Sequence, residues 1–473
     1  MRGQSDLSHR RLWSRRLLPL LLLPLLLGLS IGSWACAGAG TAQRRPGLSV
    51  VTQALGSTST VSSATTVSSA NTVSSATTVT QSGVPSTVLR KGPYLMYTGD
   101  DTAMTVLWQT KMSVKRATVE WGSSAAYGHG PTTVVESPST IAPAATDSTT
   151  AGGLSAGADG HLFRYDITGL QPGAQVYYRV TIDGSAFAGS FRAAPSPDSA
   201  STVLYAVSDT QDHPQAFQQV IQALLADVDN APASRSTICL HAGDFVGSGL
   251  VESAWDKGFF LQSSPSVSRF LGSMPVMGTL GNHEGYGDTE SQRTLSDRGM
   301  LLRKYWPGLF TVAPPHFYYS FDNGLVHVAV LDTWTTTFDP DSAEYKWLAQ
   351  DLASTTRPWK IVMLHNPAWA AFAGRDNYAS IREYLCPLFQ STAVDLVIQG
   401  HDHFYSRCEV DGVQYVTIGG GGGELVPPDT ALPHVVTAAE VHHFIRLDVT
   451  GDSLSETAIS VDGKILDSFV LKH

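Results

Sequence analysis

The sequence predicts an all-β domain followed by a larger α/β domain, and two patterns carry this prediction. Between residues 91 and 195, short runs of alternating apolar and polar residues are separated by polar turns, as in 175–182. Such alternation is typical of half-buried strands in a β-sandwich. From residue 202 onward, apolar runs recur with helical patterns between them, which indicates an α/β domain with largely parallel sheets.

The composition supports two or three folded units and excludes several classes of protein. The chain has 473 residues, of which 42% are hydrophobic and 15% charged, which argues against wholesale disorder. Lys and Arg number 31 against 41 Asp and Glu, so the formal net charge is −10. An acidic chain does not hold nucleic acid by broad charge neutralisation, and the sequence shows no evident nucleic-acid-binding module. Anionic substrates therefore need local help, such as bound cations.

Residues 1–37 have the order of an export signal, so we expect a secreted, periplasmic or cell-surface protein. Arginines precede an apolar run at 17–31, and small residues follow it. The small residues around Ala37 predict cleavage after that position. Two alternatives are lipidation of Cys36, which would tether the protein to a membrane, and a twin-arginine signal at Arg15 and Arg16. A retained membrane anchor is disfavoured by the short length of the run and by its prolines.

The rest of the chain divides into three predicted segments. Residues 38–87 read as a Ser/Thr-rich linker, because a Thr-Val-Ser-Ser-Ala-Thr/Asn hexapeptide repeats between 60 and 77 and cannot bury a core. The β-domain is assigned to 88–196, where no cluster of ligand-type residues is found. The α/β domain is assigned to 197–473.

Ligand-type residues follow five of the apolar runs in the α/β domain. In α/β sheets, functional groups gather at the carboxyl ends of the strands, so residues far apart in the sequence are expected to meet at one edge. Taken alone, each group has an ordinary structural explanation, such as a turn or a buried histidine. Together, in this order, they predict a shared site. The five groups are Asp209-Thr210-Gln211, Gly243-Asp244, Gly281-Asn282-His283-Glu284, His365-Asn366 and Gly400-His401-Asp402-His403.

On these motifs, residues 203 to about 423 resemble the calcineurin-like metallophosphoesterase family. With the preceding β-domain and its Gly92-Pro93-Tyr94-Leu95 phrase, the chain is similar to purple acid phosphatases. The resemblance implies a four-layer α/β/β/α sandwich preceded by a fibronectin type III-like β-sandwich. It also implies two metal ions, and the donor types suit Fe, Mn or Zn. The implied ligands are Asp209 and His403 for the first ion, Asp244 for both, and Asn282, His365 and His401 for the second.

The implied chemistry is hydrolysis of a phosphate ester. Two ions about 3.5 to 4 Å apart lower the pKa of a shared water, orient the ester and neutralise charge as phosphorus is attacked in line. His283 follows a ligand position without being one, so it is the candidate to stabilise the transferring phosphoryl group or to protonate the leaving oxygen. Glu284 is expected to orient the turn.

The sequence also departs from the family pattern. Gln211 stands where many relatives have a His ligand. Three roles remain open for it: it binds the first ion, it holds a metal-bound water, or it does neither. His213 is an alternative ligand. Gly247 stands where purple acid phosphatases have a Tyr, so the purple charge-transfer colour is not expected. The extra histidines of those enzymes after His365 are also missing.

Three residues are candidates for substrate binding, and several functions remain open. Arg375 is the nearest cation to the fourth motif, and Tyr286 and Tyr405 follow metal motifs. The favoured function is an exported dinuclear phosphoesterase acting on phosphate mono- or diesters. The alternatives are a tyrosinate-type acid phosphatase, an extracellular nucleotidase or nuclease, and a cell-surface binding protein without catalysis.

Overall fold

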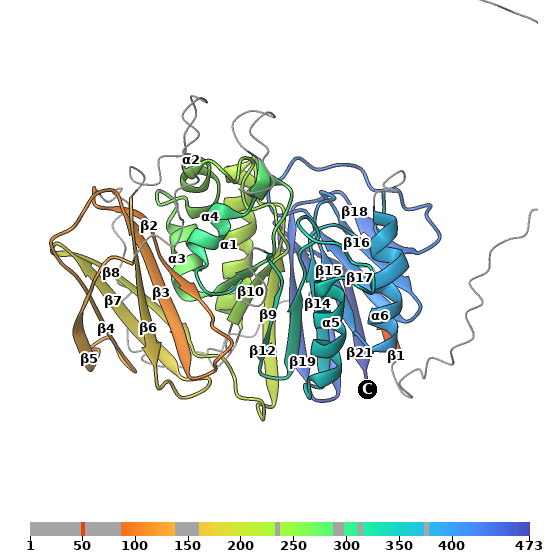
Figure 1. Ribbon diagram of the computed structural model, residues 1–473, viewed down its shortest axis with the longest axis horizontal. Helices are drawn as coiled ribbons and strands as arrows, with labels where there is room; N and C mark the ends of the chain where they lie inside the picture. Colours follow the sequence, from red (N-terminus) through yellow and green to blue (C-terminus); the bar gives the residue numbers. More distant parts are fainter. Residues whose placement is uncertain are drawn as a thin grey trace, which may run out of the picture. The chain divides into compact units, whose positions relative to one another are not determined.

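A computed structural model describes residues 49–52, 87–137, 160–231, 237–286, 298–310, 316–372 and 378–473 (Figure 1). The predicted export signal at 1–37 and the hexapeptide repeats at 60–77 lie outside the described residues. None of the helices in these ranges combines the length and the apolar character that crossing a bilayer requires.

The β-domain is a sandwich of two antiparallel sheets, as predicted. Along β7 every second residue is buried, because alternate side chains of a strand point to opposite faces. Trp108 on β3 stacks on Phe163 of β6 with 5.4 Å between ring centroids. One sheet contains β2 (Leu89–Met96), β3 (Ala103–Thr110) and β6 (His161–Thr168), and the other β5 (His129–Val134), β4 (Ala117–Gly122), β7 (Gln175–Ile182) and β8 (Ser185–Arg192), in these orders.

The α/β domain contains two seven-stranded sheets. The first has the order β1 (Ser49–Thr52), β21 (Ile465–Lys472), β20 (Ser453–Ser460), β19 (His443–Thr450), β9 (Ser201–Val207), β10 (Thr237–His241) and β11 (Val276–Gly278). The second has the order β12 (Tyr319–Asn323), β13 (Val326–Val330), β14 (Trp359–Leu364), β15 (Leu396–Gln399), β17 (Val413–Ile418), β16 (Tyr405–Val410) and β18 (Val435–Ala439).

Helices cover these sheets and separate their strands in the sequence. The α-helices are α1 (Pro214–Asn230), α2 (Glu252–Trp255), α3 (Pro265–Ser273), α4 (Met300–Tyr305), α5 (Ala343–Ser354) and α6 (Cys386–Ser391). Single turns of other helix types lie at η1 (Asp256–Phe260), η2 (His283–Gly285) and η5 (Ile381–Leu385). Strands and helices therefore alternate along this part of the chain, as the sequence predicts.

The burial along β14 shows how the second sheet is layered. Ile361 and Met363 belong to the large core that also contains residues of the first sheet, such as Leu204. Val362 and Leu364, which point to the opposite face, belong to a separate core with residues of α5 and α6. The sheet therefore lies between the first sheet and these helices, which agrees with the predicted layered α/β architecture.

The sheets are mixed rather than largely parallel, which corrects one expectation. In each sheet a run of parallel strands is extended by antiparallel strands: β9-β10-β11 lie at one edge of the first sheet, and β13-β14-β15-β17 lie inside the second. The hairpins from β19 to β21 cause this in the first sheet, because strands joined by short turns can only pair antiparallel. The carboxyl ends that matter for the site still belong to the parallel strands.

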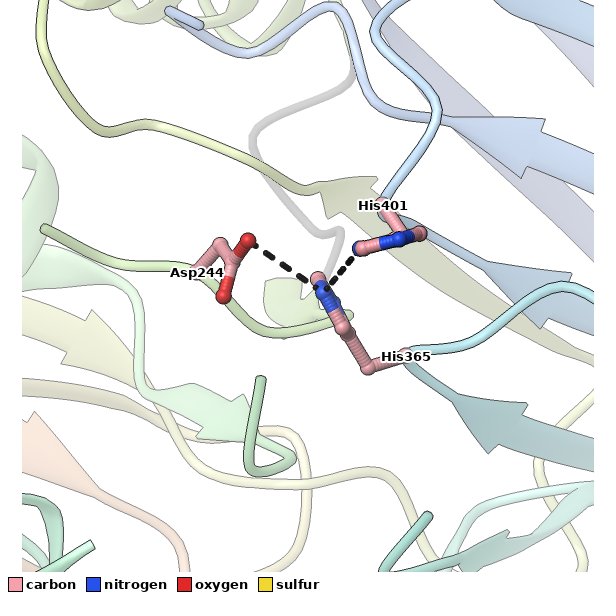
Figure 2. Close-up of side chains that lie close together, drawn as sticks. All are labelled: Asp244, His365 and His401. Carbon is pink, nitrogen blue, oxygen red and sulfur yellow. Dashed lines mark hydrogen bonds and ion pairs between the residues drawn. The ribbon is translucent and has the colours of Figure 1, made fainter. Parts of the chain in front are cut away.

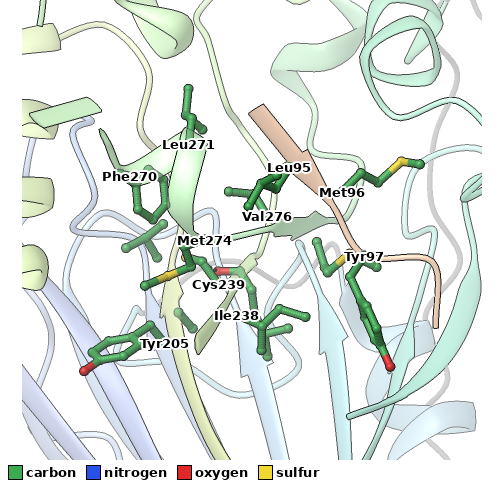
Figure 3. Packing of buried hydrophobic residues seen from close by; sticks show 14 of the residues in the cluster. Leu95, Met96, Tyr97, Tyr205, Ile238, Cys239, Phe270, Leu271, Met274 and Val276 are labelled. Atoms are coloured by element: carbon green, nitrogen blue, oxygen red, sulfur yellow. Dashed lines mark hydrogen bonds between the residues drawn. The ribbon is translucent and has the colours of Figure 1, made fainter. Parts of the chain in front are cut away.

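The β-domain is attached to the α/β domain through β2 and neighbouring strands. The Tyr94 hydroxyl donates to the carbonyl of Tyr305 at 2.8 Å, and the Tyr178 hydroxyl donates to that of Gly272 at 2.8 Å. The buried ammonium of Lys91 lies 2.6 Å from Glu252. Figure 3 shows the apolar part of this contact, in which Leu95 of β2 lies beside Val276 of β11 within a common core.

Several strands were not foreseen from the sequence, among them β1 and β2. β1 lies within the segment assigned to the linker, and it pairs antiparallel with β21 from Ser49↔Lys472 to Thr52↔Phe469. β2 contains Gly92-Pro93, a dipeptide that ordinarily indicates a turn, and its pairing with β3 is irregular there. Both strands lie at edges of their sheets, where a weak strand pattern is sufficient because pairing occurs on one side only.

Candidate metal centre

The predicted ligands come together where parallel strands of the two sheets end. Asp209 follows β9 and Asp244 follows β10 in the first sheet, whereas His365 and His401 follow β14 and β15 in the second. Asp209, Asp244 and His401 have positive φ angles of 56°, 55° and 71°. Non-glycine residues rarely adopt this conformation, and when they do they cluster at functional sites.

One group of side chains surrounds His365. Its Nε2 lies 3.2 Å from Oδ2 of Asp244 and 3.2 Å from Nδ1 of His401 (Figure 2). Asn282 completes the group, with its Oδ1 3.0 Å from Nε2 of His365 and 2.9 Å from Nδ1 of His401. The Asn282 amide is oriented by its Nδ2, which donates to the Tyr286 hydroxyl at 3.1 Å. Four potential metal-ligand atoms, one each from Asp244, Asn282, His365 and His401, therefore lie close together.

A second group contains Asp209, His403 and Gln211. The Nε2 atom of His403 lies 3.5 Å from Oδ1 of Asp209 and 3.0 Å from Nε2 of Gln211. The Nδ1–H of His403 donates to the Glu424 carbonyl at 2.7 Å, which directs Nε2 toward the site. Gln211 is fully buried, and its Oε1 has no hydrogen-bond partner within the described ranges.

Both groups are held by bonds between the loops that carry them. The backbone N–H of His401 donates to both oxygens of Asp209, at 3.0 and 2.9 Å. The backbone N–H of His283 donates to Oδ1 of Asp244 at 2.8 Å, which leaves Oδ2 facing His365. The two carboxylates are therefore oriented before any ion binds.

Glu284 orients the turn, as the sequence suggested. Its buried carboxyl group accepts backbone N–H bonds from Asp244 at 3.0 Å, Phe245 at 2.9 Å and Gly281 at 2.8 Å. Burial, together with the charge of Asp244, raises the pKa of Glu284 to about 7. Glu284 therefore connects the Asp244 loop to the Asn282 turn.

The electrostatics of the site favour positive charge. Burial by itself would lower the pKa of His365, but the carboxylate of Asp244 outweighs burial and raises this pKa to about 9. Burial opposes protonation of His403 as well, and the bond to Asp209 again raises the pKa to about 9. Burial would raise the pKa of Asp209, yet His403 and His365 lower it. Two fully buried carboxylates thus draw compensating cations into the site.

These residues fit a pair of metal ions. Imidazole, carboxylate and amide donors suit Fe, Mn and Zn. Asp244, His365 and His401 offer ligand atoms within 4.8 Å of one another. The orphaned Oε1 of Gln211 is a further buried acceptor beside His403, and rotating the amide by half a turn would aim it at an ion bound there.

His283 lies at the edge of the ligand cluster. Its Nδ1–H donates to the Gly247 carbonyl at 2.8 Å, and its Nε2 lies 3.9 Å from Oδ2 of Asp244. The side chain is 24% exposed, and its ring lies 4.7 Å from that of Tyr286. Nε2 of His283 therefore lies where a molecule bound between Asp244 and the solvent would contact it.

The glycine run at residues 419–423 packs directly against the second group, which contains Asp209 and His403. The N–H of Gly421 donates to the Ser208 carbonyl at 2.9 Å, and that of Gly423 to the Asp209 carbonyl at 2.8 Å. A Cβ on Gly423 would lie 2.6 Å from the His403 ring. This run therefore forms a close-packed wall of the site.

The remaining predicted residues have different outcomes. Tyr286 lies at the site, bonded to Asn282. Tyr405 does not, which corrects its assignment to substrate binding: as the first residue of β16 it points into the core and donates its hydroxyl to Asp467 at 2.9 Å. Arg375 lies outside the described residues. His213 is the exposed residue that precedes α1, and no contact with Asp209 places it in the ligand group.

The Gly247 position has a structural explanation. A Cβ there would lie 2.2 Å from Oδ1 of Asp212, so the Asp212 carboxylate occupies the space that a side chain would need. A tyrosine at this position would require Asp212 to move.

Three residues near the group around His365 and His401 were not among the sequence predictions. The rings of Trp334 and Tyr378 lie 6.4 and 5.8 Å from that of His401. The guanidinium of Arg298 lies 5.7 Å from the Trp334 ring and donates to the Trp334 carbonyl at 3.1 Å. None of them adjoins a ligand motif in the sequence, so no local signal identified them.

Comparisons with known proteins agree with this arrangement. Residues 202–405 match the model of the calcineurin-like phosphoesterase family, and residues 91–194 match that of the purple acid phosphatase N-terminal domain. Purple acid phosphatase 21 of Arabidopsis thaliana is 28% identical over 282 residues, which cover 56% of this chain and 59% of that protein. A nucleotide pyrophosphatase/phosphodiesterase of Hordeum vulgare is 26% identical over 285 residues, covering 52% of this chain and 74% of that protein.

A solved structure shares the fold. That of purple acid phosphatase PPD1 from yellow lupin (Lupinus luteus) seeds matches with a TM-score of 0.64 and 19% identity, covering 80% of this chain and 74% of that one. The predicted fold class and the family resemblance are thereby confirmed. The chain spans only about three fifths of the length of the Arabidopsis relative (59%).

Proposed function

We propose that this chain, which carries a calcineurin-like phosphoesterase domain behind a purple acid phosphatase N-terminal domain, hydrolyses phosphate mono- or diesters with two bound metal ions. One observation carries the proposal. Side chains from the ends of four strands in two sheets converge into two adjoining groups of buried donors, with Asp244 in one and Asp209 in the other. Such paired sites are built for in-line displacement at phosphorus.

The residues have distinct roles in this proposal. Asp209, Gln211 and His403 would hold one ion, Asn282, His365 and His401 the other, and Asp244 both. Bound Mn, Fe or Zn would supply an activated water and offset the negative charge of the ester. The acidic protein would otherwise repel a phosphate, because its formal net charge is −10.

His283 is the proposed proton donor to the leaving oxygen. The Gly247 carbonyl accepts the Nδ1–H, which fixes the ring so that Nε2 faces Asp244 and the space beyond it. A proton on Nε2 is then aimed at the substrate side of the site. Positioned acid groups of this kind contribute about 10² to 10⁴ in rate.

Three further features complete the proposal. Residues 1–37 support export of the protein, with lipidation of Cys36 as the alternative that would keep it at a membrane. Gly247 and the Asp212 carboxylate beside it support a site without tyrosinate, and thus a colourless enzyme. Tyr286 and Arg298 are the proposed contacts for the substrate beyond the phosphate.

The test is an assay of the mature chain with its metal content quantified. An aryl phosphate monoester and the matched diester are offered to the wild type, Asp244→Ala and His283→Ala. We expect two ions per wild-type chain and turnover of at least one ester. Asp244→Ala should lose both ion binding and turnover, whereas His283→Ala should keep both ions and lose about 10²-fold or more in kcat.

Two results would contradict the proposal. Unchanged turnover in Asp244→Ala would exclude the metal-based mechanism. Absence of turnover on both esters, in wild type with two bound ions, would favour a binding protein without catalysis.

A further inference from the structure

One hydroxyl group beneath the metal centre connects the two loops that carry its carboxylates. Thr210, the residue after Asp209, donates its Oγ1–H to the carbonyl of Phe245 at 2.9 Å. Phe245 is the residue after Asp244. The backbone N–H of Thr210 also donates to the Asp244 carbonyl at 2.9 Å. A single residue therefore joins the Asp209 loop to the Asp244 loop by two bonds, one through its backbone and one through its side chain.

A buried histidine completes this connection. His241, the last residue of β10, has its Nε2 3.1 Å from Oγ1 of Thr210. Because the hydroxyl proton of Thr210 goes to Phe245, Nε2 of His241 must be the donor in this contact. The imidazole also stacks on the Phe245 ring with 3.7 Å between centroids and 8° between planes. It thus contacts both ends of the connection.

His241 is a polar residue in a fully buried, aromatic environment, so its hydrogen bond requires an explanation. The side chain is fully buried, and the Phe259 ring packs edge-on against it at 5.8 Å. Burial lowers the pKa of His241 to about 3, so the ring is neutral and has one N–H to donate. An apolar ring would fill this position without the cost of burying polar atoms. The bond to Thr210 is the contact that a phenylalanine cannot provide.

We propose that Thr210 and His241 form a positioning pair that fixes the separation of the Asp209 and Asp244 loops, and with it the separation of the two metal ions. The inference rests on the proposed function, because it assigns a role toward ions that the function requires. Neither residue reaches the substrate, so both are positioning residues. Sites with two ions need their ligands held within about 0.5 Å, and a hydroxyl bridge between the ligand loops is suited to that task.

The test uses two matched variants of the mature chain. Thr210→Val keeps the shape of the side chain and removes the hydroxyl, whereas Thr210→Ser keeps the hydroxyl and removes the methyl group. Binding of Mn²⁺ is followed by titration calorimetry, and the electron paramagnetic resonance spectrum reports whether the two bound ions are magnetically coupled. Both readouts are independent of turnover.

We expect Thr210→Val to weaken binding of the second Mn²⁺ by about tenfold or more, because the Phe245 carbonyl and the His241 N–H lose their buried partner. Its spectrum should be that of separate ions. Thr210→Ser should bind two coupled ions with an affinity close to that of wild type. His241→Phe keeps the stacking and tests the pair from the other side, with the same weakening expected. Circular dichroism confirms that each variant is folded.

The outcomes separate this inference from the proposed function. If wild type and Thr210→Val, or wild type and a folded His241→Phe, bind two coupled ions equally well, the positioning role is wrong while the phosphoesterase proposal stands. If Thr210→Ser is impaired as severely as Thr210→Val, the methyl group and not the hydroxyl is important, and the inference is again wrong. If wild type itself binds fewer than two ions, the inference fails together with the function.

Discussion

The charge state of His327 makes the stability of the protein depend on pH. The side chain is 7% exposed on β13, between Oδ1 of Asp322 and Oδ2 of Asp351, each 2.8 Å from a ring nitrogen. Arg357 donates to the other oxygen of Asp322 at 2.9 Å. Burial would lower the pKa of His327, but the bonds to the two aspartates outweigh it and raise the pKa to about 9.

The magnitude follows from the difference between the folded and unfolded states. A histidine with an unfolded pKa of about 6.5 and a folded pKa near 9 contributes about 3 kcal/mol to stability. Because the folded pKa is the higher one, the contribution is complete below about pH 6.5 and disappears as the pH rises through 9. Replacing His327 with Gln, which cannot be protonated, removes this contribution.

Urea unfolding at several pH values measures the effect. The free energy of unfolding of wild type should exceed that of His327→Gln by an amount that shrinks by about 3 kcal/mol between pH 6 and pH 10. His129→Gln is the matched control, because His129 is exposed on β5 and stacks on Trp121. A difference between wild type and His327→Gln that stays constant across this range would refute the reasoning.

Three other predictions concern packing, the domain contact and the metal. Gly423→Ala should displace the His403 ring and weaken ion binding measured by calorimetry, whereas Gly451→Ala, where a Cβ meets nothing within 4 Å, should bind normally. Lys91→Met removes the buried cation that pairs with Glu252 and Asp256, while Lys304 still pairs with Glu252, and should lower the free energy of unfolding in urea by about 2 kcal/mol; an unchanged value would exclude a stabilising role. Chelation should lower the melting temperature, and added Mn²⁺ should restore it; a melting temperature insensitive to chelator would show that no ion stabilises the fold.

The sequence was informative wherever local periodicity and strand ends coincide. Alternating apolar and polar residues predicted β7, and a continuous apolar run predicted β14. Both strands form. Asp209, Asp244 and His365 were found because each directly follows such a run, and parallel strands bring their carboxyl ends to one edge. The convergence of these side chains was therefore predictable from the order of motifs along the chain.

Other parts required the three-dimensional structure. Tyr405 is only two residues from His403, yet it begins β16 and its side chain points into the core. Arg298 comes from a segment without any ligand motif, and it lies near His401 only through Trp334, whose carbonyl accepts a hydrogen bond from its guanidinium. Proximity to a motif in the sequence therefore assigned Tyr405 wrongly to the site and did not identify Arg298. The direction of a side chain depends on the element that carries it and not on its distance from a motif along the chain.

The Thr210 connection was invisible for the same reason. A threonine inside a metal motif is unremarkable in the sequence, and His241 reads as the end of an apolar strand. Their relation depends on the parallel pairing of β9 and β10, which places His241↔Val207 in register at the base of both ligand loops.

Anomalous diffraction from crystals of the mature protein grown with Mn²⁺ tests the central claim most directly. We predict two peaks about 3.5 to 4 Å apart, with Asp244 between them, His365 and His401 beside one and Asp209 and His403 beside the other. A single peak, or peaks away from these side chains, would contradict the account.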